Sequence, residues 1–290
     1  MAILPLRNRL YLYQNVHVTR HIMRSLLALF GLVSITTLTH LALGQEDGSI
    51  PERHEREELG INPYTAPSIE RIFAQLDQLK PFPFDKLWLG LPKTSPSKRE
   101  QKGLIFGTLV ADGFLLVEAE RKKLIEDLGR VLIREARGLG VADRAIRHSA
   151  SLTELGRHGD WPAVRKELVA TQADVEQAMI DLRDQKMAHL ISLGGWLRGL
   201  EICAGAVESD FSPRRAKVLA DSELVDYFVE ELKTLPPPIA HSPLIEKIRK
   251  GVTTIRTLLK KEASAGLRLA EVKAIHAEAQ TLNLAIRQGD

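Results

Sequence analysis

The signal that most constrains the fold of this chain is a capping residue followed by proline, which recurs along the sequence. It stands at Ser95-Pro96, Asp160-Trp161-Pro162, Ser212-Pro213 and Ser242-Pro243. A Ser or Asp side chain accepts hydrogen bonds from the first free N–H groups of a helix, and proline suits the first turn because it has no N–H to lose. Each copy therefore predicts the start of a helix. Because apolar residues recur three or four positions apart and no run alternates with a period of two, we expect an all-α protein.

The apolar periodicity predicts about eight helices joined by short loops. Short connections place consecutive helices antiparallel, so the expected architecture is a helical bundle or a stack of helical hairpins. No motif recurs at a fixed period, which argues against a helical repeat array. The expected helices cover 68–79, 96 to as far as 137, 142–155, 162 to a break near Asp184, 190–206, two further segments that start at 213 and 243 on either side of a stop at 236–238, and 267–287.

The beginning of the chain has the features of an export signal. Residues 25–43 are largely apolar, Met23-Arg24 precedes them, and Ala42-Leu43-Gly44 supplies small residues at the spacing a signal peptidase requires. We therefore predict a cleaved signal peptide over 1–44, with Met23 as the true start. The alternative is an uncleaved membrane anchor, which the polar residues near the end of the apolar segment disfavour.

The remaining chain divides into a lead-in and one domain. Residues 45–66 are rich in charge, glycine and proline without apolar periodicity, which predicts a flexible lead-in. Residues 67–290 are expected to form a single all-α domain. We expect the protein to be exported, and periplasmic if the host has an outer membrane, with membrane contact only if the leader stays uncleaved.

The charge of the chain gives no indication of a nucleic-acid partner. The formal net charge is +3, from 40 basic and 37 acidic side chains, but residues 1–44 hold four arginines and no acid. Removal of that segment leaves 36 basic side chains against 37 acidic ones, a net charge of −1. The basic excess therefore belongs to the leader, and the expected partners are a protein or a small polar ligand.

The motifs of common catalytic and metal sites are missing from the sequence. The single cysteine, Cys203, cannot form an intramolecular disulfide, and its apolar setting predicts a buried side chain. The histidines outside the leader are scattered, and none belongs to a HExxH or Glu-x-x-His arrangement. No nucleophile elbow, phosphate-binding loop or dinucleotide fingerprint is present. We therefore expect no catalytic residue, no cofactor and no metal.

Two helices carry small residues at regular spacing. Gly103, Gly107 and Ala111 are four residues apart, as are Gly195 and Gly199, with Gly194 next to the first of these two. Glycine within a helix costs about 1 kcal/mol relative to alanine, so another interaction should offset it. We predict that these helices cross closely, which small residues permit; the alternative is space for a ligand against the backbone.

Two charges interrupt the apolar runs of these same helices. Asp112 lies in the first, and Arg198 lies in the second with Glu201 one turn later. An unpaired buried charge is costly, so the preferred interpretation is an interhelical ion pair of Arg198 with Asp112, or a contact of Arg198 with Glu201 at a helix surface. The alternative is a polar ligand-binding site formed by Asp112, Trp196, Arg198 and Glu201.

Two hypotheses of function follow from these patterns. The first is an exported helical binding or scaffolding protein, because the sequence combines a leader and helices with no catalytic motif. The second is an enzyme or cofactor carrier whose site lies between helices around Asp112, Arg198 and Glu201, since helical bundles place sites on facing helices.

Overall fold

The computed structural model describes residues 70–220, 222–261 and 266–289. The chain divides into two compact units, Met1–Gly48 and Ser49–Asp290, and every described residue belongs to the second. The predicted leader over 1–44, the lead-in over 45–66 and the expected cap at Ser68 therefore lie outside the described residues.

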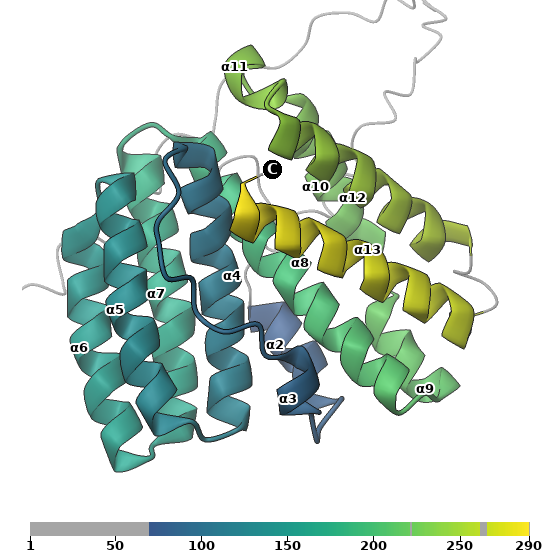
Figure 1. Ribbon diagram of the computed structural model, residues 1–290, viewed down its shortest axis with the longest axis horizontal. Helices are drawn as coiled ribbons and strands as arrows, with labels where there is room; N and C mark the ends of the chain where they lie inside the picture. Colours follow the sequence, from purple (N-terminus) through teal and green to yellow (C-terminus); the bar gives the residue numbers. More distant parts are fainter. Residues whose placement is uncertain (1–69, 221, 262–265, 290) are drawn as a thin grey trace, which may run out of the picture. The chain divides into compact units, whose positions relative to one another are not determined.

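The described ranges contain helices and no strand, and eight of the helices are long (Figure 1). The all-α prediction is confirmed. The elements are α2 (Glu70–Asp77), α3 (Phe84–Leu87), α4 (Arg99–Glu118), α5 (Lys122–Leu139), α6 (Ala142–His158), α7 (Trp161–Asp181), α8 (Gln185–Ser209), α9 (Pro213–Ala216), the 3-10 helix η1 (Lys217–Leu219), α10 (Ser222–Lys233), α11 (Pro237–Ala240), α12 (Pro243–Lys261) and α13 (Leu269–Gln288).

Three of the four predicted cap-and-proline starts begin helices. The carboxylate of Asp160 accepts a hydrogen bond from the N–H of Ala163 at 3.1 Å, and proline occupies the first turn of α7. Ser212 caps α9 in the same way. The hydroxyl of Ser242 accepts from the N–H of Ile245 at the start of α12. Each cap binds an N–H group only three residues later, so it forms without help from distant parts of the chain.

The fourth predicted start, at Ser95-Pro96, is wrong. Helix α4 begins at Arg99. The hydroxyl of Ser95 donates instead to the carboxylate of Glu135 on α5, at 2.7 Å. Glu135 is fully buried, so a hydrogen bond to its carboxylate outweighs a solvent-exposed helix cap.

The long pattern after residue 96 is divided between two helices. Glu120 has a φ of 53° in the short connection from α4 to α5, and Arg183 has a φ of 58° just before the predicted break at Asp184. A left-handed residue cannot continue a right-handed helix, so both positions end the preceding helix. The prolines at 236–238, predicted as a stop, do follow the end of α10 but also form the first turn of α11.

The helices pack in two connected groups. Helices α4, α5, α6 and α7 contact one another in sequence, and α7 returns to contact α4 (Figure 1). Helix α8 packs against both α4 and α7. Helix α13 packs against α8, α12 packs against α13, and α10 packs against α12. Helices α4 and α8 are thus central, which explains why residues 103–117 and 187–207 are buried on every side.

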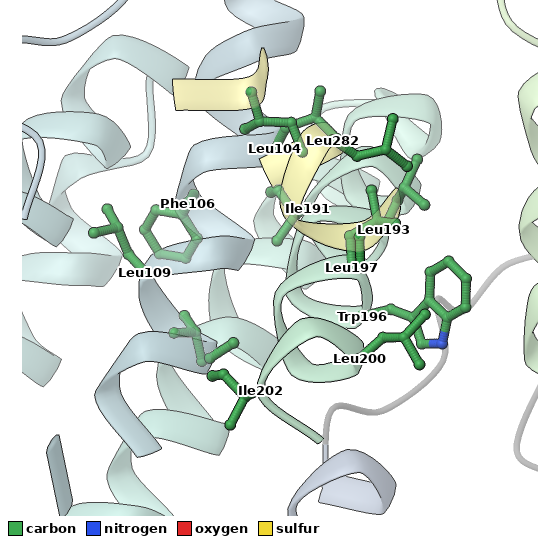
Figure 2. Close-up of a cluster of buried hydrophobic side chains, with 14 of the residues drawn as sticks. Leu104, Phe106, Leu109, Ile191, Leu193, Trp196, Leu197, Leu200, Ile202 and Leu282 are labelled. Atoms are coloured by element: carbon green, nitrogen blue, oxygen red, sulfur yellow. The ribbon is translucent and has the colours of Figure 1, made fainter. Parts of the chain in front are cut away.

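Helices α4 and α8 cross at the predicted glycines. A methyl group built on Gly107 would lie 1.9 Å from the carbonyl oxygen of Ile191, and one built on Gly194 would lie 2.0 Å from the carbonyl oxygen of Leu104. The predicted close crossing is confirmed. Figure 2 shows apolar side chains of both helices and of α13 gathered in this core; those labelled include Leu104, Phe106, Leu109, Ile191, Leu197, Ile202 and Leu282.

One described helix, α8, is long and apolar enough to cross a membrane by length and composition. All of its most apolar window is buried inside the protein. Buried core helices of soluble proteins pass the same test, so the length and hydropathy of α8 do not identify a membrane span.

Candidate functional site

The two charges that interrupt the apolar helices form a buried ion-pair cluster. Asp112 on α4 and Arg198 on α8 have no exposed surface, and Glu201 keeps only 2%. The Nε atom of Arg198 donates to Oδ1 of Asp112 at 2.7 Å. Its Nη1 atom lies 2.8 Å from Oε2 of Glu201, without the alignment of a hydrogen bond. The predicted pair of Arg198 with Asp112 is confirmed, and the contact with Glu201 is present but buried, not at a helix surface as predicted.

A second arginine, which the sequence did not indicate, completes the cluster. Arg287 in the last turn of α13 donates from Nη2 to Oδ2 of Asp112 at 2.5 Å, and from Nη1 to the carbonyl oxygen of Gly90 at 2.7 Å. The cluster thus holds two arginines and two carboxylates, so its formal charge is zero. We call Asp112, Arg198, Glu201 and Arg287 the buried charge cluster.

The carboxylates of the buried charge cluster keep Arg198 protonated. Burial lowers the pKa of Arg198, but the nearby carboxylates of Asp112 and Glu201 outweigh burial and raise it overall. Arg198 therefore keeps its proton. A buried pair of this kind adds little net stability, whereas removal of one partner leaves an uncompensated charge and costs about 3–5 kcal/mol.

Trp196 does not join the buried charge cluster. It is two positions before Arg198, which is about 200° around a helix, so the two side chains leave α8 in nearly opposite directions. The Trp196 ring lies 5.1 Å from that of Phe228 on α10. Figure 2 likewise shows it pointing away from Phe106 and Leu109. The structure brings together three of the four predicted site residues and places the fourth elsewhere.

Two cavities next to the core are small. One of about 20 Å³ lies beside Trp196; another, of about 10 Å³, lies between α2, α4 and α7. A single water needs about 10–15 Å³ on this measure, so each has room for about one water. Neither cavity is lined by Asp112, Arg198 or Glu201. The first is lined by Gln75, Trp196, Leu200, Cys203, Val218, Leu219, Leu224 and Leu259.

A polar contact between α8 and α10 was not predicted. The hydroxyl of Tyr227 lies within hydrogen-bond distance of Nδ1 of His189, and Nε2 of that histidine lies 3.7 Å from Glu231. Burial lowers the pKa of His189; Glu231 opposes that shift and Lys186 adds to it. A neutral ring lets the tyrosine donate to Nδ1. The contact satisfies a buried histidine, which is the usual role of such a residue.

One of the two histidines of α6, His148, lies between two acids of α7. His148 places Nδ1 2.8 Å from Glu167 and Nε2 3.3 Å from Asp174. Arg144 and Arg147 also bind Asp174. Burial raises the pKa of Asp174, but the histidine and the two arginines outweigh burial and lower it overall. The described residues contain no group of three or more His, Cys, Asp or Glu side chains placed to hold a metal ion.

The cysteine has the predicted environment. Cys203 keeps 2% of its surface exposed. Burial raises the pKa of its thiol to about 12, so the reactive thiolate is scarce at neutral pH. The prediction of a buried small side chain is confirmed.

The chain between α3 and α4 is held by cations that bind its carbonyl oxygens. We call residues 87–96 the connector. Helices α8, α13, α5 and α4 each contribute one basic side chain to it. The contacts are Arg198 to Leu87, Arg287 to Gly90, Arg134 to Pro92, Lys93 and Thr94, and Lys102 to Pro96.

Comparison with known proteins does not identify a relative of this chain. The side chains and their surroundings are therefore what supports a function. No family model, no curated protein and no solved structure matches this chain.

Proposed function

We propose that this protein is an exported helical binding or scaffolding protein that recognises its partner through its outer surface. The observation that carries this proposal is the neutral buried charge cluster. Arg198 meets Asp112 and Glu201, and Arg287 meets Asp112, so the polar groups best placed for an interior ligand already bind one another.

The size of the cavities supports the same proposal. Sites for small molecules usually occupy about 300–1,000 Å³. The cavities beside α8 and α2 measure about 20 and 10 Å³. At either of these two places, a ligand larger than water would have to separate packed helices, which costs the burial of large apolar side chains. A surface partner requires no such separation.

Native mass spectrometry distinguishes this proposal from an interior ligand site. The protein would be recovered from the cell fraction in which it resides and sprayed from a non-denaturing buffer. We expect the mass of the polypeptide alone. A retained small molecule that is lost in the Glu201→Gln variant, but kept in a variant at the exposed Glu223, would favour the enzyme or cofactor carrier with a site around Asp112, Arg198 and Glu201.

Export is the second part of the proposal, and the apolar leader over 25–43 supports it. Intact-mass and N-terminal analysis of the protein from outside the cytoplasm tests it. A chain that begins at Gln45 is the expected result. A chain that retains residues 23–44 and is found in membranes would contradict cleavage and indicate a tethered scaffold.

A further inference from the structure

A carboxyl group on α7 has unusual surroundings where that helix meets α8. Glu176 and Gln172 are one turn apart on α7, and the amide Nε2 of Gln172 donates to Oε1 of Glu176 at 2.7 Å. The hydroxyl of Ser192 on α8 donates to the same oxygen, also at 2.7 Å. The carboxyl group therefore connects the two helices through neutral donors.

The other end of the glutamine amide lacks a partner. Oε1 of Gln172 is buried and accepts no hydrogen bond within the part of the chain that the structure describes. A buried acceptor without a donor is destabilising, so native proteins rarely leave one. When an amide N–H binds one oxygen of a carboxyl group, a proton on the other carboxyl oxygen can reach the amide oxygen. An ionised carboxylate has no such proton.

We propose that Glu176 is held as a neutral carboxylic acid that donates to Oε1 of Gln172, and that loss of this proton loosens the packing of α7 against α8. The acid and the amide then form two hydrogen bonds, one in each direction. On ionisation the proton goes to solvent, the amide oxygen loses its donor, and a negative charge remains between two helices.

Among the described residues, no cation forms an ion pair with Glu176 within 4.0 Å to stabilise its ionised form. Helices α4, α6 and α8 pack against α7, and charged groups on each of them bind elsewhere. On α8, Lys186 and His189 face Glu231 of α10; on α6, Arg144, Arg147 and His148 face Asp174 and Glu167; on α4, Arg99 binds Asp184.

The pKa of Glu176 agrees with this geometry. Although the residue keeps part of its surface exposed, burial is the largest influence and raises the pKa from 4.5 to about 7, against the hydrogen bonds from Ser192 and Gln172. In the unfolded chain the group ionises near its usual pKa, so folding takes up a proton between the two values. The stability that this group provides is therefore full below about pH 4.5 and lost as the pH rises to about 7.

Urea unfolding of the full-length protein across pH tests the proposal with the Glu176→Gln variant. Glutamine keeps the shape, accepts the same hydrogen bonds and can donate to Gln172 at any pH. Relative to this variant, we expect the folding equilibrium constant of the unmodified protein to fall up to tenfold per pH unit between about pH 5 and 7, and to stay level above. The exposed Glu223→Gln variant is the control and should follow the unmodified protein.

Infrared spectroscopy supplies a readout that does not depend on unfolding. The carbonyl stretch of a protonated carboxylic acid should be present near pH 6, disappear by about pH 8 and be missing from Glu176→Gln throughout. The proposal is overturned if the band is absent from the unmodified protein near pH 6, or if the two proteins show the same pH dependence of unfolding. Should Glu176→Gln fail to fold, the infrared titration of the unmodified protein and of Glu223→Gln still decides.

Discussion

Replacing Gly107 by alanine should separate the two central helices. The new methyl carbon would lie 1.9 Å from the carbonyl oxygen of Ile191 and 2.6 Å from the backbone nitrogen of Gly195. An ordinary contact begins near 3.4 Å, so α4 and α8 must part by about 1.5 Å at this point. Both obstructing atoms belong to the backbone, so no change of rotamer can relieve the contact.

The expected net loss of stability is about 2 kcal/mol. Overpacking a core usually costs about 1–3 kcal/mol, and the upper end applies here because backbone meets backbone. Alanine is a better helix former than glycine by about 1 kcal/mol, which offsets part of this cost. The remainder should appear in the free energy of unfolding.

The matched control is Gly138→Ala on α5. That glycine is also helical, but it is exposed, and its added methyl group would meet only the Lys102 side chain, whose methylene groups must shift slightly while its amino group binds Pro96. This variant should gain up to about 1 kcal/mol from helix propensity. Urea unfolding followed by circular dichroism measures both, since a shift of midpoint at constant slope reports stability. If Gly107→Ala is as stable as Gly138→Ala, the close crossing does not hold.

Three further perturbations have defined outcomes. Asp160→Ala removes the cap of α7 and should lower the free energy of unfolding by about 1 kcal/mol in urea titrations; no loss would mean that the cap is not formed. Cys203 should react with a thiol reagent at about pH 8 only after denaturant is added, and rapid labelling of the native protein would contradict its burial. Burial raises the pKa of Asp226, but Lys260 and Arg256 outweigh burial and lower it overall. The stability from this carboxylate should thus be lost as the pH falls below about 4, and Asp226→Asn should flatten that part of the acid unfolding curve.

Local signals in the sequence predicted most helix starts and the central crossing. The cap at Asp160 depends only on residues next to it in the chain. The small residues around Gly107 permit close packing whatever the partner helix is, so both features could be predicted without a structure. The same logic predicted the Arg198–Asp112 pair, because a charge inside an apolar helix requires a partner.

Contacts between distant segments were beyond such reasoning. Arg287 binds Asp112 across 175 positions of sequence, and nothing in the pattern of the last helix distinguishes it from a solvated arginine. Ser95 resembles a helix cap, but a buried carboxylate on another helix takes its hydroxyl. Trp196 was grouped with Arg198 by proximity in sequence, although the helical angle between them already places them on different sides.

The connector imposes a different kind of constraint on this protein. Arg198, Arg287 and Arg134 contact it through backbone carbonyl oxygens, which every amino acid carries, and Lys102 binds both the carbonyl oxygen of Pro96 and the hydroxyl of Ser95. Apart from Ser95, whose hydroxyl binds Glu135 and Lys102, side chains along 87–96 can therefore change during evolution with little effect on these contacts. The spacing of the oxygens cannot, because each basic side chain comes from a different helix of a packed core. Insertions and deletions in this segment should be selected against far more strongly than substitutions, so that its length is inherited while its sequence drifts.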